Sequence, residues 1–283
     1  MRFLIIFLIA FSGSSLVLKR NLFHHEITKH QSIDLDTTAV FKRKGEDVKV
    51  HLKKHTDPSG LKIGNIVLLP GWNYSSLDWC TKTSFCEKAR ALGFDLILVD
   101  MKKSVYASER YRETRGDMRK YATRTWFKDT LIPSLQQDFK LLMAGENNFV
   151  LGLSTGGRGA SLLCLDLPNV FKKGASLSGD YNQASIPKDN LMRIFYGAYH
   201  SHKSRWSGVD NVVYEIDRFK VPFYIGHGLQ DKVCPPQQSI EFYDSLRVHQ
   251  PDLEVELHID STAKHDYNYW GSEVDNVLGF FLK

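Results

Sequence analysis

The sequence feature that most constrains the fold is at residues 152–156, which read Gly-Leu-Ser-Thr-Gly and directly follow the apolar run at 149–151. The pattern G-x-S-x-G between a buried strand and a helix is typical of a tight turn that lifts the serine oxygen clear of a sheet. Glycines are needed there because a side chain would collide with the neighbouring strand or helix. The pentapeptide alone is a common match, so Ser154 becomes a candidate nucleophile only if suitable partners follow it.

Two partners follow in the required order. A serine hydroxyl needs a base within hydrogen-bond reach and an acid that orients the base. On this kind of turn the acid and then the histidine come after the serine along the chain. Asp231 follows the apolar strand expected at 221–225, and the carboxyl ends of parallel strands face the ligand-binding crevice. His265 follows the last expected strand at 253–259. We therefore predict a triad of Ser154, Asp231 and His265.

Other readings of these side chains stay open. Asp231 could instead cap the helix that begins near residue 236, as aspartates often do. His265 could be a surface-loop histidine. His227 is the rival base, but it precedes the acid, and we expect it to pack beneath the loop. Asp180 also follows an expected strand and is a reserve acid.

Acyl transfer at a serine also needs two backbone donors that bind the developing oxyanion. The first is expected to be the amide of Thr155, directly after the nucleophile. The second is expected from the loop at 70–73, with Trp72 preferred and Gly71 as the alternative. Four aromatic residues could wall a substrate pocket or equally pack in the core: Tyr74, Tyr106, Trp206 and Tyr269.

Apolar and amphipathic segments alternate along the rest of the chain. Strands are expected at 37–42, 48–55, 65–69, 94–99, 149–151, 174–177, 221–225 and 253–259. Helices are expected after the serine turn and at 77–92, 126–139, 236–248 and 274–281. Continuous apolar strands separated by helices indicate an α/β fold with a mostly parallel central sheet and helices on both faces. Residues 181–215 interrupt the alternation and are predicted to form a small cap or lid.

The chain ends and length suggest one processed domain. The first 15 residues combine a charged start, an apolar run at 3–11 and small residues at 12–15, the layout of a secretory signal peptide. The run is short for a membrane span, which needs about 20 residues, although an uncleaved anchor is the alternative. We expect a secreted or periplasmic protein without a stable membrane span. Residues 16–283 suit a single α/β domain, since such domains often run to about 250 residues.

Net charge gives no sign of a nucleic-acid partner. The chain carries +5 with a pI near 8.9, but it has no lysine-arginine block, RNA-binding aromatic motif or zinc-ligand spacing. The segment at 100–120 is locally basic and could recognise an anionic group. It also contains Glu109, Glu113 and Asp117, so we favour a solvated loop whose charges balance.

Cysteine positions do not favour a disulfide. Cys80 and Cys86 fall in one expected helix, where six residues correspond to about 9 Å along the axis on different faces. A disulfide needs Cα atoms closer than about 7 Å, so the pair could form only if the helix is broken. Cys164 is expected to be a small buried hydrophobic residue. No essential disulfide is predicted among these two, Cys164 and Cys234.

The same residues carry a family resemblance. Residues 123–133, 151–160 and 166–179 resemble the esterase family that includes esterase D (S-formylglutathione hydrolase), feruloyl esterases and mycolyltransferases. The resemblance implies an α/β-hydrolase fold, carboxylic ester hydrolysis and no cofactor. It also implies that Ser154 is the nucleophile, Asp231 the acid and His265 the base. Thr155 departs from the methionine that is frequent at that position.

These observations predict a secreted serine hydrolase that cleaves a small-molecule, carbohydrate or lipid ester through an acyl-enzyme. The same triad would also suit a peptidase, a thioesterase or an acyltransferase. A hydrolase-fold protein that binds a partner without turnover is the alternative from another class. Retention of all three triad candidates favours the enzyme. The oligomeric state is left open.

Overall fold

The structure is a computed structural model that describes residues 36–43, 46–118 and 122–283. These residues belong to one compact unit, 32–283. The signal peptide expected at residues 1–15 lies outside the described residues. Among the described residues, no helix is both long enough and apolar enough to cross a membrane.

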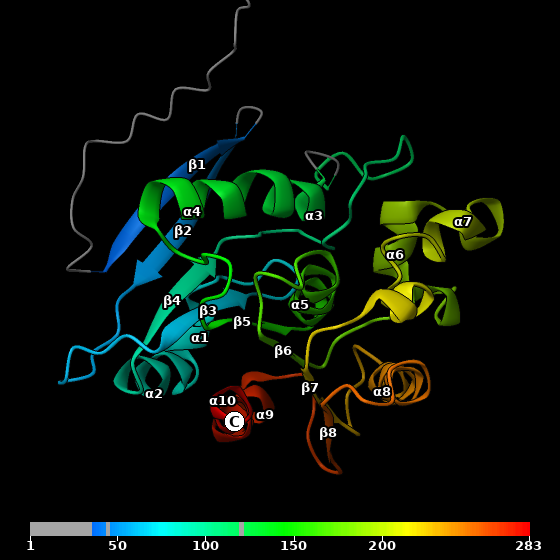
Figure 1. Ribbon diagram of the computed structural model, residues 1–283. Coiled ribbons are helices and arrows are strands. Elements are labelled where there is room, and N and C mark those ends of the chain that lie inside the picture. Colours follow the sequence, from blue (N-terminus) through cyan, green and yellow to red (C-terminus); the bar gives the residue numbers. More distant parts are fainter. Residues whose placement is uncertain (1–35, 44–45, 119–121) are drawn as a thin grey trace, which may run out of the picture. The chain divides into compact units, whose positions relative to one another are not determined.

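The described strands form one sheet in the order β1-β2-β4-β3-β5-β6-β7-β8 (Figure 1). Their bounds are Thr37–Arg43, Glu46–Lys53, Gly64–Leu69, Phe94–Val99, Asn148–Leu153, Lys173–Leu177, Phe223–Gly228 and Val255–Asp260 for β1 to β8 in turn. The strands β1 and β2 form an antiparallel hairpin, and β2 is antiparallel to β4. All pairs from β4 through β8 are parallel. The mostly parallel sheet expected from the sequence is confirmed.

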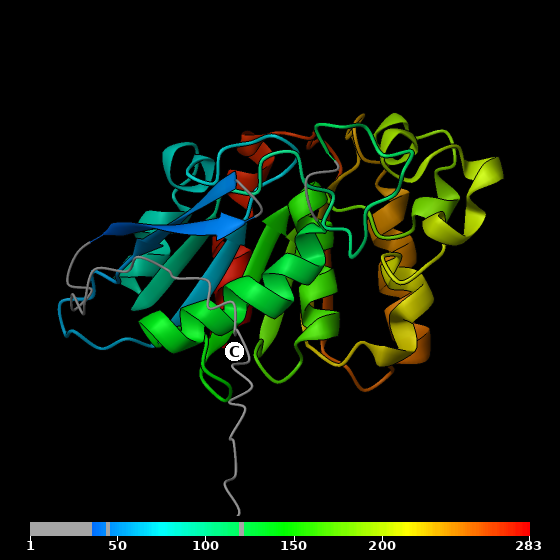
Figure 2. The same ribbon diagram turned by 90° about the horizontal axis from the view of Figure 1, so that it is seen from above.

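The central strands β3, β4, β5 and β7 are buried at every position. Their side chains alternate between two apolar clusters, one on each face of the sheet, because successive residues of a strand point to opposite faces. One cluster includes residues of α3, α4, α5 and α8, and the other includes residues of α1, α2, α9 and α10. Figures 1 and 2 show helices on both sides of the sheet, as expected.

The α-helices are α1 Asp78–Thr81, α2 Phe85–Ala91, α3 Thr123–Trp126, α4 Ile132–Phe139, α5 Thr155–Asp166, α6 Asn190–Tyr196, α7 Lys203–Trp206, α8 Gln237–His249, α9 Tyr267–Ser272 and α10 Val274–Leu282. The other helical segments, of 3₁₀ or π type, are η1 Phe127–Leu131, η2 Gln183–Ser185, η3 Tyr199–Ser201 and η4 Val212–Arg218. The segment η1 is a π-helix that joins α3 to α4. It precedes Pro133, which has no amide to continue the α-helical pattern, so the expected helix at 126–139 continues through a local change of pitch.

The structure corrects the prediction for Cys80 and Cys86. The helix expected at 77–92 is broken between α1 and α2, where the Thr83 hydroxyl bonds to the carbonyl of Trp79. The break brings the two cysteine Cα atoms to 4.9 Å, and their sulfurs form a disulfide. The prediction was wrong because it assumed a continuous helix. Cys164 is free and buried, as expected.

The segment between β6 and β7 folds as the short helices α6 and α7 with the 3₁₀ segments η2, η3 and η4. We refer to residues 182–218 as the cap. Met192, Phe195, Tyr196 and Trp206 of the cap form a buried cluster with the loop at 100–118. The Arg115 amide donates to the carbonyl of Ile194 at 3.0 Å, and Figure 2 shows this loop beside α6 and α7. Short helical segments therefore occupy residues 181–215, and their role as a cap or lid stays a prediction.

Candidate active site

Ser154 occupies a strained turn between β5 and α5. Its φ of 55° lies in the left-handed region, which a residue other than glycine rarely adopts and which costs about 1 kcal/mol or more. The surrounding backbone holds it there, since the Ser154 amide donates to Leu177 O at 2.9 Å. A Cβ on Gly152 would lie 1.9 Å from Gly156 O, so only glycine allows the turn to close this tightly.

The three predicted triad side chains come together at the carboxyl edge of the sheet. Nε2 of His265 lies 3.0 Å from Oγ of Ser154, and Nδ1 of His265 lies 2.6 Å from Oδ2 of Asp231. Because a carboxylate only accepts, Nδ1 donates to Asp231 and Nε2 is left to accept the serine proton. The three residues follow β5, β7 and β8, and their meeting depends on the parallel strands ending at one edge.

The Asp231 carboxylate is buried and fully engaged. Its Oδ1 accepts the amides of Val233 and Cys234, each at 2.8 Å, so it caps its own loop and not the helix α8. Its Oδ2 lies 3.2 Å from Nε2 of His227 in addition to the bond with His265. Burial opposes ionisation, but the hydrogen bonds from His227 and His265 outweigh it and hold the pKa of Asp231 well below its usual range.

Trp270 packs against the ring of His265 and so supports the loop that carries it. The edge-on rings of His265 and Trp270 have centroids 5.1 Å apart, and Nε1 of Trp270 donates to Oγ of Ser178 at 3.1 Å. The following residue, Asp266, caps α9 by accepting the amides of Asn268 and Tyr269. The capped helix α9 therefore fixes the backbone that follows His265, and Trp270 fixes the position of its ring.

The candidate oxyanion donors border the nucleophile. The amide of Thr155 begins α5, where helical amides have no acceptor within the helix. Within the described residues, the amide of Trp72 makes no hydrogen bond. A Cβ on Gly71 would lie 3.1 Å from Cβ of Ser154, so the loop at 70–73 packs directly on the serine. The Tyr106 hydroxyl anchors this loop by donating to Pro70 O at 3.1 Å.

Three of the four aromatic residues expected at a pocket wall are core residues instead. Tyr106, Trp206 and Tyr269 have exposed fractions of 1%, 0% and 3%, so the expectation is corrected for them. Each fills space between elements that the sequence alone does not show to be in contact. Tyr74 is partly exposed, and its ring lies 5.8 Å from that of Tyr267 and 6.1 Å from that of Trp270.

The sequence profile of the prolyl oligopeptidase family matches residues 99–283, the part of the chain that contains all three triad residues. The chain belongs to the prolyl oligopeptidase family. It is a serine hydrolase, and no curated protein sequence matches it. The family is a peptidase family by description, whereas the resemblance noted in the sequence is to esterases, so both kinds of acyl substrate need consideration.

Several solved structures of low sequence identity share the fold of this family member. S-formylglutathione hydrolase from Staphylococcus aureus superposes with a TM-score of 0.69 at 18% identity, covering 88% of this chain and 98% of that one. A ferulic acid esterase gives 0.62 at 16% identity, covering 87% and 96%. Acylaminoacyl peptidase from Pyrococcus horikoshii gives 0.63 at 16% identity, covering 87% and 41%. The α/β-hydrolase fold expected from the resemblance is confirmed.

Asp180, the alternative acid considered from the sequence, makes no contact with His265 in this family member. Its Oδ2 accepts from Gln183 at 3.1 Å and lies 3.8 Å from Nη1 of Arg158. Burial raises the pKa of Asp180 to about 6, and Arg158 partly opposes the rise. Sequence reasoning missed Arg158, which is fully buried one helical turn after Ser154 and bonds to Tyr196 of the cap. A charged residue inside the small-residue run at 156–160 is the signal that could have revealed it.

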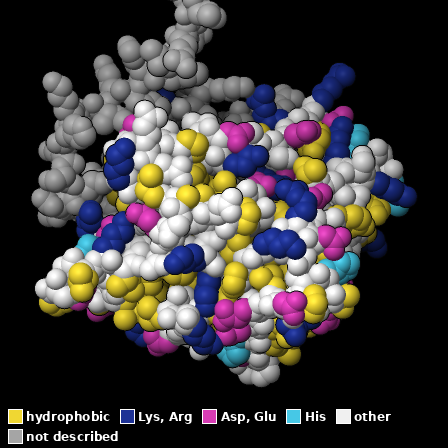
Figure 3. Space-filling model, viewed as in Figure 1, with side chains coloured by type: hydrophobic (Ala, Val, Ile, Leu, Met, Phe, Trp, Pro, Cys, Tyr) yellow, Lys and Arg dark blue, Asp and Glu magenta, His cyan; other side chains and the backbone are white. Residues whose placement is uncertain are grey.

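Two acidic residues of the basic loop after β4 form ion pairs with basic side chains of the loop or of the cap. Lys103 and Arg115 pair with Asp117 at 2.8 and 2.5 Å, and Arg205 of the cap pairs with Glu113 at 2.7 Å. The face in Figure 3 shows Lys and Arg side chains interspersed with Asp and Glu. These pairs support the interpretation of a solvated loop over recognition of an anionic group.

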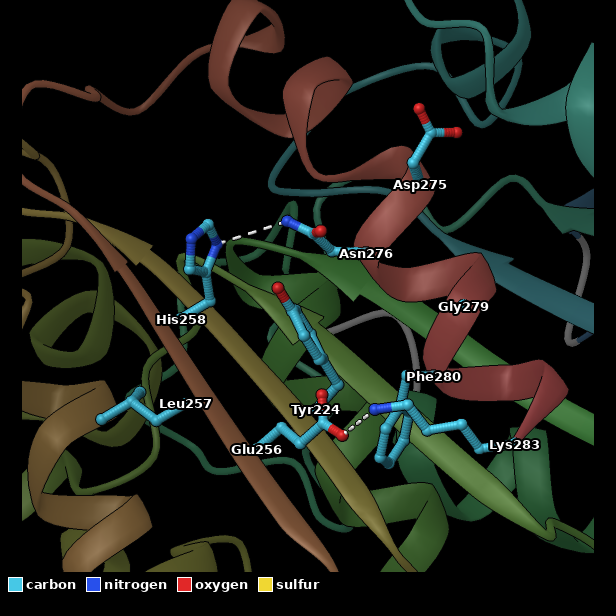
Figure 4. A pocket seen from close by; sticks show the side chains of 9 residues that line it. All are labelled: Tyr224, Glu256, Leu257, His258, Asp275, Asn276, Gly279, Phe280 and Lys283. Atoms are coloured by element: carbon cyan, nitrogen blue, oxygen red, sulfur yellow. Dashed lines mark hydrogen bonds and ion pairs between the residues drawn. The ribbon is translucent and has the colours of Figure 1, made fainter.

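A surface pocket of about 390 Å³ lies away from the triad, between β7, β8 and α10 (Figure 4). Beside it, the buried Glu273 accepts from the Tyr224 hydroxyl at 2.5 Å and from Nδ1 of His258 at 2.7 Å. In Figure 4 His258 also faces Asn276 across the pocket. No residue predicted from the sequence for the site lines this pocket, so it does not contribute to the triad.

Proposed function

We propose that this chain is a secreted enzyme that hydrolyses carboxylic esters through an acyl-enzyme on Ser154. The observation that carries the proposal is the continuous relay from Oγ of Ser154 to His265 at 3.0 Å and from His265 to Asp231 at 2.6 Å. These distances lie in the range that proton transfer from a serine nucleophile needs.

In the proposed mechanism, His265 removes the Ser154 proton through Nε2 as Oγ attacks the ester carbonyl carbon. The amides of Thr155 and Trp72 bind the carbonyl oxygen as it becomes negative. The tetrahedral intermediate collapses, and His265 gives its proton to the leaving alcohol. Water then attacks the acyl-enzyme with His265 again as base, and the acid is released. Asp231 remains ionised throughout and stabilises the imidazolium.

The expected substrate is a small-molecule, carbohydrate or lipid ester. Trp72 and Tyr74 lie on the loop that packs on Ser154, and both are partly exposed, so we propose them as the aromatic contacts to the substrate. Secretion is supported by the Cys80–Cys86 disulfide, since such bonds persist in oxidising compartments.

A peptidase is the second candidate, because the family profile that matches residues 99–283 is that of a peptidase family. The triad does not distinguish amide from ester cleavage, since both proceed by attack of serine on an acyl carbon. The two candidates differ in the leaving group that His265 must protonate, an amine or an alcohol.

The proposal is tested with 4-nitrophenyl esters of increasing acyl length, aryl esters, thioesters and peptide anilides, each assayed with the wild type and Ser154→Ala. We expect ester turnover by the wild type and a kcat lower by roughly 10⁴-fold or more in the variant. Mass spectrometry of a rapidly quenched reaction should show the acyl group on Ser154. Near-wild-type ester turnover by Ser154→Ala would contradict the mechanism, and preferential cleavage of the anilides would establish the peptidase instead.

A further inference from the structure

His227 contacts the triad without belonging to it. It lies in β7, four residues before Asp231, and its side chain is fully buried. Sequence order excludes it as the base, because the histidine of such a triad follows the acid. A buried imidazole needs hydrogen-bond partners, and those of His227 are Ser239 and Cys234, with the catalytic acid 3.2 Å from its Nε2.

The hydrogen bonds of the His227 ring define its orientation. Nε2 lies 3.1 Å from Cys234 O and 3.2 Å from Oδ2 of Asp231. Since both partners only accept, Nε2 carries a hydrogen, which it donates to Cys234 O with Oδ2 of Asp231 close beside. Nδ1 lies 2.7 Å from Oγ of Ser239 in α8, which holds the ring from the opposite side. The ring is therefore fixed with its N–H next to the acid.

The Asp231 carboxylate is consequently fixed at both oxygens. Two loop amides, from Val233 and Cys234, bind Oδ1, while the two histidines bind Oδ2. Rotation of the carboxylate would break bonds on both sides. The oxygen that accepts from the catalytic His265 is also the one that His227 contacts, so any change at His227 acts directly on that bond.

We propose that His227 is a positioning residue of the triad, which orients Asp231 and withdraws part of the negative charge that Oδ2 presents to His265. The inference rests on the proposed function of the triad. Without this donor, Oδ2 presents more negative charge to His265, which stabilises the imidazolium and makes the base more strongly basic. A carboxylate with one contact fewer is also held less precisely, so it fixes the His265 tautomer less well. The consequences are a lower kcat and a changed pH dependence of kcat/KM.

The test compares three substitutions at one position with 4-nitrophenyl acetate as the substrate. His227→Gln keeps an amide donor near the place of Nε2. His227→Asn has the same amide on a shorter side chain that does not reach Asp231, and His227→Leu has no donor. We expect kcat to fall about 10- to 100-fold in the Leu and Asn variants, the size of effect known for outer groups that orient metal-ligating side chains, with KM little changed. His227→Gln should regain most of the rate.

The pH profile and a double-mutant cycle separate positioning from a structural role. In His227→Leu the acidic limb of the kcat/KM profile should move, which a loss of folded protein would not cause. Added to Asp231→Ala, His227→Leu should cause no further loss of rate, because its effect passes through the missing carboxylate. Gln238→Met removes a buried polar group of α8 that bonds to the amides of Tyr181 and Asn182 and should leave the profile in place.

Two outcomes overturn the inference: equal rates and pH limbs for the Gln and Asn variants, or additive losses in the cycle. For a variant whose turnover is too low to measure, the rate at which a fluorophosphonate labels Ser154 replaces kcat in the comparison of the His227 variants. Ser154→Ala is measured beside them. If it keeps the wild-type rate, the proposed function itself fails. If it is inactive while His227→Leu behaves as wild type, only the role of His227 is refuted.

Discussion

The triad region and the cap are held together in different ways. Each triad residue follows a parallel strand, and its loop is fixed by bonds from backbone amides, such as Ser154 N to Leu177 O and Val233 N to Oδ1 of Asp231. The cap is attached mainly through side chains, by the aromatic cluster around Trp206 and by buried ion pairs. The sheet therefore provides the catalytic geometry, while the surroundings of the site depend on contacts between distant side chains.

Arg124 is the centre of the cap attachment. Its guanidinium binds both oxygens of Asp166 at 2.6 and 2.7 Å and Oδ1 of Asp210 in the cap at 3.0 Å. Asp210 also accepts the Ser108 amide at 2.9 Å from the loop after β4. All three charged side chains are buried, so the network joins α3, α5, the loop and the cap with little screening by water.

The largest expected effect on kcat comes from replacing Asp231, and the same replacement at Asp180, on the same edge of the sheet, is the comparison. Asp231→Asn should lower kcat on an activated ester by about 10⁴-fold, because an amide favours the wrong histidine tautomer. Asp180→Asn should lower it less than about tenfold, since Asp180 contacts Gln183 and Arg158 and not the histidine. Steady-state kinetics of both variants checks the assignment. Comparable losses would show that the two acids share the role.

The cap attachment should be the next most sensitive feature. Arg124→Met leaves the Asp166 and Asp210 carboxylates buried without their partner, and we expect the free energy of unfolding to fall by about 3 to 5 kcal/mol. Urea denaturation measures it. Arg115→Met is the matched control, because Arg115 pairs with Asp117 on the surface and should have little influence. Equal stability of the two variants would contradict a dominant role for the buried network.

The glycines of the triad turn should matter for stability as well as for rate. Gly152→Ala places a Cβ 1.9 Å from Gly156 O, and the forced backbone shift should cost about 3 kcal/mol and displace Ser154. In Gly279→Ala the new Cβ meets nothing within 4 Å, so this helical substitution should stabilise by about 0.5 to 1 kcal/mol. Thermal unfolding and ester kinetics of the pair test the turn. If Gly279→Ala also destabilised the protein, the loss in Gly152→Ala could not be assigned to the close contact with Gly156 O.

The smallest expected effect concerns the Cys80–Cys86 disulfide, which lies beside the triad region without touching it. Its short loop should contribute about 2 kcal/mol, so Cys80→Ala with Cys86→Ala should lower the unfolding free energy by that amount. The ester kcat should stay near the wild-type value. Wild type treated with dithiothreitol should match the double variant. A large loss of kcat would mean that α1, through the bond from Trp79 to Leu69 O, also controls the loop at 70–73.

Sequence alone determined the parts of this protein that depend on local chain geometry. The small residues around Ser154 predict the strained turn because only glycine tolerates those close contacts. Asp231 and His265 were found because the first follows an apolar strand and the second an alternating strand, and parallel strands bring their carboxyl ends to one edge. Periodicity thus reports which segments are buried and where they end, which is sufficient for the sheet and for the three triad residues.

Only the tertiary structure decided which element covers each buried group. The break near Thr83 that brings Cys80 to Cys86, the burial of Tyr106 against the loop at 70–73, and the bond from His227 to Asp231 all join residues whose spacing carries no such signal. The physical reason is that packing and buried hydrogen bonds depend on distances between elements. A pattern along one segment records that it has a partner, but not which residue the partner is.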